Sequence, residues 1–292
     1  MCPSRSIERP QGRAAPSPPP VGVEKTWGGP AFSREPPGQA SAAVEARGLT
    51  VRFGGHVAVH EVSCTLPRGS LTAIVGPNGA GKTTFFNLLS GQIRPTAGSI
   101  HLYGQDVTAL SAAQRAALGI GRAFQLTTLF PALSVLDNVR LALARLRERS
   151  WRLLSIAADD APGIEQARHW LERTHLLQRA HEPAAQLSHG DQRKLEVAML
   201  LAMRPRVFMF DEPTAGMSVD EVPVILELIQ EIKDDPMNTV LLVEHKIQVV
   251  HSLADRILVL HNGELLAQGD PAEVMDSPLV REAYLGVAGA RS

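Results

Sequence analysis

The segment Gly76-Pro-Asn-Gly-Ala-Gly-Lys-Thr83 constrains the fold more than any other part of the chain. It fits the pattern G-x-x-x-x-G-K-[ST] at every fixed position, between an apolar run at 71–75 and a helical pattern at 82–90. A short, fully apolar run is typical of a strand that is covered on both faces. Glycines let successive backbone N–H groups point inward around a phosphate, and the helix that follows adds a partial positive charge. The segment therefore predicts a strand, a phosphate-binding loop and a helix.

The residue types in this loop predict contacts with a nucleotide and its metal ion. Lys82 supplies a cation for the β- and γ-phosphates, and the Thr83 hydroxyl can coordinate Mg²⁺. The predicted nucleotide contacts here are Gly76, Pro77, Asn78, Gly79, Ala80, Gly81, Lys82, Thr83 and Thr84. Kinases, GTPases, motor proteins and transport ATPases share such a loop, so the loop alone leaves the class of protein open.

Strand-like and helix-like patterns alternate along the rest of the chain. Segments 44–53 and 58–66 alternate apolar and polar residues around Gly54-Gly55, which predicts paired antiparallel strands; another exposed strand is expected at 99–103. Helical periodicity over about 134–186 indicates a helical insertion, with Leu136, Val139, Leu143 and Leu146 near one face. Strand-like runs at 207–210, 239–243 and 256–260 alternate with helical patterns at 192–203 and 222–233. This order predicts a parallel sheet wrapped by helices, in two lobes.

Composition excludes several classes of protein. The 29 basic and 30 acidic residues give a net charge of -1, so no nucleic-acid partner is expected. Cys2 and Cys64 cannot build a disulfide framework or a four-cysteine zinc site, which favours a reducing cytosol. No run approaches the roughly 20 apolar residues that cross a bilayer. Residues 1–44 are rich in proline, glycine, serine and alanine, and we expect a disordered tail, with 45–292 as the folded domain.

Two adjacent carboxylates follow the apolar run at 207–210. The carboxyl ends of parallel strands are where open α/β sheets place groups that contact a ligand. Asp211 is the expected partner of Mg²⁺, and Glu212 suits a base that orients or deprotonates the attacking water.

These segments together resemble the ABC ATPase family from about residue 44 to 286. Leu187-Ser-His-Gly-Asp-Gln192 is similar to the family's signature loop, and Gln125 in Gly121-Arg-Ala-Phe-Gln125 is similar to its Q-loop glutamine, a further nucleotide and Mg²⁺ contact. His245, in Leu241-Leu-Val-Glu-His245, resembles the switch histidine that contacts the γ-phosphate. The resemblance implies an α/β P-loop NTPase fold: a RecA-like parallel-sheet core, a small antiparallel β subdomain and an α-helical subdomain inserted at roughly 126–192. It also implies hydrolysis of ATP with Mg²⁺, with Glu212, His245 and Lys82 catalytic.

The signature loop implies a dimer, since Ser188, His189, Gly190 and Asp191 would face the nucleotide of the opposite subunit. His189 replaces the family's commoner glycine and Asp191 its usual glutamine; we interpret both as marks of an importer subtype. Phe53 matches the aromatic residue that stacks on adenine, but a core phenylalanine is an equal alternative. The aspartate role of the family's D-loop is assigned to neither Ser218 nor Asp220.

Within the family, Arg52-Phe-Gly-Gly55, Asp211-Glu-Pro-Thr-Ala-Gly-Met217 and the ending Arg281-Glu-Ala-Tyr-Leu-Gly286 resemble branched-chain amino-acid importers. That resemblance implies a second ATPase subunit, two membrane-spanning permease subunits and an extracytoplasmic binding protein, with this chain on the cytoplasmic face of the membrane. Urea, amide and lipopolysaccharide transport ATPases share much of the pattern. Alternatives of another class are a soluble ABC ATPase without a transport role and a nucleotide-binding regulatory module.

Overall fold

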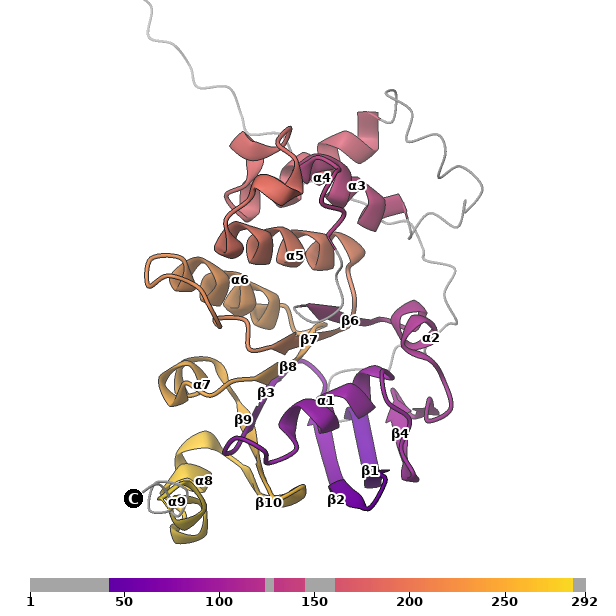
Figure 1. Cartoon of the computed structure of the whole chain (residues 1–292), viewed down its shortest axis with the longest axis vertical. Coiled ribbons are helices and arrows are strands. Elements are labelled where there is room, and N and C mark those ends of the chain that lie inside the picture. The colour runs from indigo at the N-terminus through magenta and orange to yellow at the C-terminus, as the bar shows by residue number, and fades with distance from the viewer. Residues whose placement is uncertain (1–41, 124–128, 145–160, 286–292) are drawn as a thin grey trace, which may run out of the picture. The chain divides into compact units, whose positions relative to one another are not determined.

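The computed structural model describes residues 42–123, 129–144 and 161–285. The first of its two sheets is antiparallel (Figure 1). The strand order is β2-β1-β4-β5. The strands are β1 (Ala42–Phe53), β2 (His56–Pro67), β4 (Ala97–Leu102) and β5 (Gln105–Asp106). Alternation along β2 buries Val62, Cys64 and Leu66 while Ser63 and Thr65 stay exposed, so one face of this sheet packs on the core.

The second sheet has six strands in the order β10-β9-β3-β8-β7-β6. They are β3 (Leu71–Val75), β6 (Ile120–Ala123), β7 (Val207–Asp211), β8 (Thr239–Val243), β9 (Arg256–His261) and β10 (Glu264–Gly269). All neighbours run parallel except β9 and β10, which form an antiparallel hairpin at the edge. Every residue of β3, β7 and β8 is buried, because both faces of these strands are covered.

Some helices flank the parallel sheet, and others pack mainly against one another (Figure 1). They are α1 (Lys82–Ser90), α2 (Ala112–Ala117), α3 (Val135–Ala144), α4 (Ala161–Arg173), α5 (His189–Met203), α6 (Val222–Asp234), α7 (Ile247–Leu253), α8 (Pro271–Asp276) and α9 (Pro278–Leu285), with 3-10 turns at Leu177–Arg179 and Ala184–Gln186. Helices α3, α4 and α5 pack against one another, and α5 also contacts β6. Among the helices that the structure describes, none is long and apolar enough to cross a bilayer.

One apolar cluster joins the two sheets through α1. Phe85 and Phe86 of α1 are fully buried in it, together with Leu66 of β2 and Ile74 of β3. A second cluster lies on the other face of the parallel sheet and includes the buried residues of α3, α4, α5 and α6. The first cluster holds α1, and therefore the loop before it, against both sheets.

The expected α/β architecture is confirmed, and its main elements lie where the patterns placed them. The strand at Leu71–Val75 and the helix at Lys82–Ser90 have the predicted bounds. Leu136, Val139 and Leu143 are buried on α3 as expected, whereas Leu146 lies outside the described residues. The strands β6 and β10 were not expected. The helical segment 126–192 stays a prediction, since 126–128 and 145–160 lie outside the described residues.

The boundary expected between tail and domain, at residue 44, is placed too late. Strand β1 begins at Ala42, and Ala43 and Val44 are buried because they continue the ladder with β2, where Val44 faces Leu66. Alanine at 42 and 43 continues the composition of the preceding segment, so only the pairing reveals the strand. Residues 1–41 lie outside the described part of the chain.

Candidate functional site

The loop between β3 and α1 has, at both ends, a backbone conformation that residues other than glycine rarely adopt. Gly76 has φ 147° and Gly81 has φ 93°. A Cβ atom on Gly76 would lie 2.1 Å from the Leu260 carbonyl oxygen, and one on Gly81 would lie 2.7 Å from the Ala58 carbonyl oxygen. The loop is therefore seated directly against the backbone of β9 and β2, which fixes the direction of its N–H groups.

The loop ends at the N-terminus of α1. Gly81 precedes the first turn and has no side chain to cap it, so the amides of that turn remain available to an anion. The Lys82 amine donates to the carbonyl oxygens of Gly76 at 2.7 Å and Pro77 at 2.9 Å. Burial lowers the pKa of Lys82, against the attraction of Glu212 and Asp211. Two carboxylates thus act on the ammonium group from the adjoining strand end.

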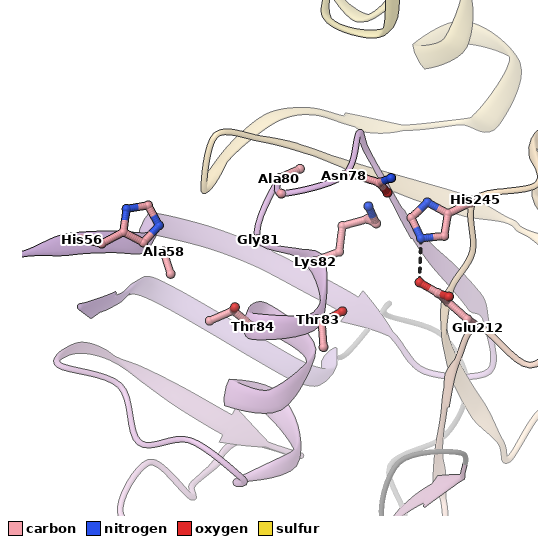
Figure 2. A pocket seen from close by; sticks show the side chains of 11 residues that line it. His56, Ala58, Asn78, Ala80, Gly81, Lys82, Thr83, Thr84, Glu212 and His245 are labelled. Carbon is pink, nitrogen blue, oxygen red and sulfur yellow. Dashed lines mark hydrogen bonds and ion pairs between the residues drawn. The ribbon is translucent and has the colours of Figure 1, made fainter. Parts of the chain in front are cut away.

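A pocket of about 250 Å³ opens over this loop. Figure 2 shows Lys82 between His56 on one side of the view and the pair Glu212 and His245 on the other. The lining residues come from the loop, α1, β2 and the ends of β7 and β8: His56, Ala58, Asn78, Gly79, Ala80, Gly81, Lys82, Thr83, Thr84, Glu212 and His245. The pocket thus brings the predicted residues Lys82, Thr83, Glu212 and His245 together around the loop.

Two neighbouring carboxylates at the end of β7 have different surroundings. Asp211 is buried and pairs with Arg122 at 3.3 Å; burial raises the pKa of Asp211 although Arg122 opposes the rise. Glu212 has φ 50°, and its side chain contacts His245 Nε2 at 2.6 Å (Figure 2). The left-handed turn at Glu212 directs the second carboxylate into the pocket, while the first stays against α1 and β6.

The oxygen donors fit a magnesium ion that is shared with phosphates. Mg²⁺ is usually held by one or two carboxylates, a hydroxyl and substrate phosphates rather than by a cage of protein side chains. Thr83 lines the pocket and Asp211 acts electrostatically on its neighbour Lys82. Within the described ranges no group of three His, Cys, Asp or Glu side chains could hold a metal by itself. The third predicted ligand, Gln125, lies outside those ranges.

The predicted signature loop is not part of the pocket. Ser188 is the N-cap of α5 and accepts from the Asp191 N–H at 3.1 Å. The Asp191 carboxylate pairs with Arg179 at 2.6 Å and Lys194 at 2.9 Å, and these bonds lower the pKa of Asp191 although its burial opposes them. Asp191 therefore connects the start of α5 to the 3-10 turn at Leu177–Arg179.

Two other residues of this loop contact the segment after β7. Gly190 is buried, and a Cβ atom there would lie 2.0 Å from a Glu221 carboxylate oxygen. Glu221 in turn accepts from the backbone N–H and the hydroxyl of Ser218. His189 is exposed and lies beside Gly216. The Glu221 side chain covers Gly190 in this conformation, and the expected contact of Gly190 with the nucleotide of an opposite subunit stays a prediction.

Comparison with known proteins decides the family. The family model described as ABC transporter matches residues 59–215, more than half of the chain. The chain belongs to the ABC transporter family. A second model, described as branched-chain amino acid ATP-binding cassette transporter, matches residues 264–290.

Relatives and solved structures of ABC proteins agree with this assignment. The high-affinity branched-chain amino acid transport ATP-binding protein BraF of Pseudomonas aeruginosa is 37% identical over 250 residues, covering 84% of this chain and 98% of BraF. LivG of Escherichia coli K12, with the same description, is 38% identical over 246 residues, covering 82% and 96%. The nucleotide-free crystal structure of an ATP-binding cassette from an ABC transporter has a TM-score of 0.72 at 26% identity, covering 83% and 98%. The predicted P-loop NTPase fold class is confirmed.

Some residues of this ABC protein's pocket were not expected, and one expected residue is elsewhere. His56 and Ala58 line the pocket. They were missed because an alternating strand pattern does not indicate which end of the strand lies beside the loop. Arg122 was quoted only as a neighbour of Gln125, although it joins β6 to α1 and Asp211. Phe53 is 50% exposed, so the core alternative is wrong, and it does not line the pocket. Its stacking on adenine stays a prediction.

Proposed function

We propose that this chain is the ATP-hydrolysing subunit of an importer, and that the pocket over the Gly76–Thr83 loop is its nucleotide site. The observation that carries the proposal is the 2.6 Å contact between Glu212 and His245 in the same pocket as Lys82 and Thr83. A carboxylate, an imidazole, an ammonium group and a hydroxyl thus line one pocket. Such a set can bind a triphosphate and direct a water molecule at it.

Each group has a distinct role in the proposed reaction. The loop amides and Lys82 bind the β- and γ-phosphates, and Glu212 orients the attacking water and accepts its proton. His245 holds the Glu212 carboxylate in place and contacts the γ-phosphate. Thr83, Asp211 and Gln125 would hold Mg²⁺, which when bound neutralises charge on the phosphate oxygens. Binding of the triphosphate moves the Lys82 amine from the Gly76 and Pro77 carbonyls to phosphate oxygens.

The Glu212→Gln variant tests the site. Glutamine keeps the size of the side chain but cannot accept a proton, so ATP binding is expected to persist while turnover falls by several orders of magnitude. Binding is measured with a fluorescent ATP analogue, and turnover as phosphate release from the complex with its partners. Glu227→Gln, at an exposed glutamate of α6 outside the pocket, is the matched control. Undiminished turnover in the Glu212 variant would remove this residue from the role of base.

For the cargo, we propose branched-chain amino acids. Support comes from the match at 264–290 to the branched-chain amino acid model and from the names of the relatives above. A lipopolysaccharide export protein, LptB of Acidithiobacillus ferridurans, is also 33% identical over 246 residues, but its name carries a different cargo. Uptake of radiolabelled leucine by vesicles that contain the complete complex, with and without the binding protein, tests the proposal. Uptake that requires this chain and ATP supports it, and ATP-driven uptake of urea or an amide instead would contradict it.

The proposed assembly is a peripheral complex on the cytoplasmic face of the membrane. It comprises this chain, a second ATPase subunit, two membrane-spanning permeases and an extracytoplasmic binding protein. Ser188 is exposed and could reach the nucleotide of the opposite subunit, whereas Gly190 becomes available only when Glu221 moves away. We therefore propose that closure of the pair includes a rearrangement of the Ser218–Glu221 contact. Affinity purification of the chain from its own cells, followed by mass spectrometry, tests the composition of the complex.

A further inference from the structure

A second cleft, of about 450 Å³, lies where the two sheets meet. Its walls come from β1 and β2 of the antiparallel sheet and from β9 and β10 at the edge of the parallel sheet. The lining residues are Glu45, Ala46, Arg47, Ser63, Cys64, Thr65, Pro67, Arg256 and Gln268. None of the residues assigned above to the nucleotide site lines it, so the proposed reaction does not account for it.

Two buried polar atoms on neighbouring strands have no hydrogen-bond partner among the described residues, and one of them belongs to a residue that lines the cleft. They are the Arg256 Nε and the Thr72 Oγ1. Thr72 on β3 and Arg256 on β9 are register partners in parallel strands, so their side chains share one face of the sheet. Leaving a buried polar group without a hydrogen bond is unfavourable. The rest of β9 up to Leu260 is buried and apolar, so the strand itself does not require an arginine at this position.

Within the described ranges, the charges around the cleft leave one cation without a counter-ion. Glu45 accepts two bonds of 2.8 Å from Arg47, so these two charges largely cancel. Burial raises the pKa of the Cys64 thiol to about 12, against the opposing effect of Arg256, so the thiol is neutral. No ion pair joins Arg256 to a residue of the described ranges. Among the residues that the structure describes, the cleft therefore presents a guanidinium group without an ion pair, beside hydroxyl and amide side chains.

We propose that this cleft binds a small metabolite through a carboxylate or phosphate group, with Arg256 as the anchor. A guanidinium group matches the geometry of both anions, because its N–H groups form parallel bonds to two oxygens. The Ser63 hydroxyl accepts from the Gly48 N–H at 2.8 Å, which leaves its own proton free to donate to the same anion. Gln268, which is exposed at the edge strand, supplies amide contacts for the uncharged part of the ligand.

The occupied cleft would bridge two hairpins that also support the phosphate-binding loop. The turn between β9 and β10 donates from the Gly263 N–H to the Ala80 carbonyl at 3.1 Å, and its carbonyl accepts from His60 of β2 at 2.8 Å. One end of each hairpin thus holds the loop while the other end lines the cleft. A ligand that joins β2 to β9 and β10 is therefore placed to bias the loop's position.

The test is isothermal titration calorimetry on the full chain with citrate and with inorganic phosphate as probes. Phosphate titrations are repeated with excess ADP, so that binding at the phosphate loop is subtracted. We expect saturable binding of at least one probe, weakened about tenfold or more in Arg256→Met because one charged hydrogen-bonding partner is lost. Arg168→Met, at an exposed arginine of α4, is the matched control and should bind as the wild type does.

A second variant keeps the test decisive if Arg256→Met does not fold. Gln268→Glu changes an exposed side chain and places a carboxylate at the cleft, which should weaken the binding of either anion. Binding of citrate alone identifies a carboxylate ligand, and ADP-resistant binding of phosphate alone identifies a phosphate ligand. If neither probe binds, or if both cleft variants bind like the wild type, the cleft is not an anion site. The comparison of the two cleft variants with the wild type does not depend on whether the nucleotide proposal is correct.

Discussion

Removal of the Arg122 guanidinium group should destabilise the protein more than most single substitutions. Arg122 donates to Asn87 Oδ1 at 2.6 Å, Ser90 Oγ at 2.9 Å and Asp211 Oδ2 at 3.3 Å, and it lies 4.6 Å from the centre of the Phe86 ring. The Arg122 and Asp211 side chains are only 7% and 5% exposed. Breaking a buried ion pair from one side costs about 3–5 kcal/mol, because the remaining charge stays buried. We expect Arg122→Met to lose about 3 kcal/mol of unfolding free energy at neutral pH.

The same loss should depend on pH in a defined direction. Burial raises the pKa of Asp211, and the attraction of Arg122 opposes that rise, so the variant raises this pKa further. A carboxyl group whose pKa is higher in the folded than in the unfolded protein binds its proton more tightly when folded. Its protonated form is therefore tolerated at low pH, and stability falls as pH increases through the folded pKa. The deficit of Arg122→Met should therefore grow as pH rises above the ordinary range of an aspartate carboxyl group, about pH 4.

Urea denaturation followed by circular dichroism, at several pH values, measures this deficit. Arg122→Lys keeps the charge but cannot contact three acceptors with one planar group, so it should recover only part of the stability. Arg281→Met removes an exposed arginine that pairs with Asp276 and should change stability by less than about 0.5 kcal/mol. A deficit of Arg122→Met below about 1 kcal/mol, or one that does not change with pH, would refute the argument that this ion pair is buried and required.

Three further substitutions test other parts of the structure. Gly81→Ala places a Cβ atom on a left-handed backbone, 2.7 Å from the Ala58 carbonyl oxygen. We expect thermal denaturation to show a loss of about 1–3 kcal/mol of unfolding free energy, and ATP binding to weaken. Wild-type values of both would show that the loop adapts to the side chain. Glu221→Ala uncovers Gly190, and ATP-dependent dimerisation, measured by light scattering, should strengthen several-fold; unchanged association would mean that the cover is irrelevant. In a Cys2→Ser background, Cys64 should react with iodoacetamide at pH 8 only after denaturation, because burial raises the pKa of its thiol to about 12. Rapid labelling of the folded protein would contradict that burial.

Local patterns were sufficient for the elements that carry their own signal. The apolar run at Leu71–Val75 and the glycine-rich loop after it located a strand, a turn and a helix with the bounds found in the structure. Asp211, Glu212 and His245 were expected at strand ends, and the parallel order of β7 and β8 brings those ends together. Strand β6 was missed because Ile120-Gly-Arg-Ala123 is short and half polar, and it becomes a strand only by pairing with β7. Pairing energy comes from a distant segment and leaves no local pattern.

The sequence by itself determined the class of protein, the phosphate-binding loop and the side chains that surround it. Those features depend on residue type and spacing along one strand, one turn and one helix, which are local properties of the chain. Only the tertiary structure decided that Arg122 pairs with Asp211, that Glu221 covers Gly190 and that the Arg256 Nε has no hydrogen-bond partner within the described part of the chain. Each of these contacts, or its absence, depends on segments far apart in sequence. Their meeting is set by how the sheets and helices pack, which no single stretch of residues specifies.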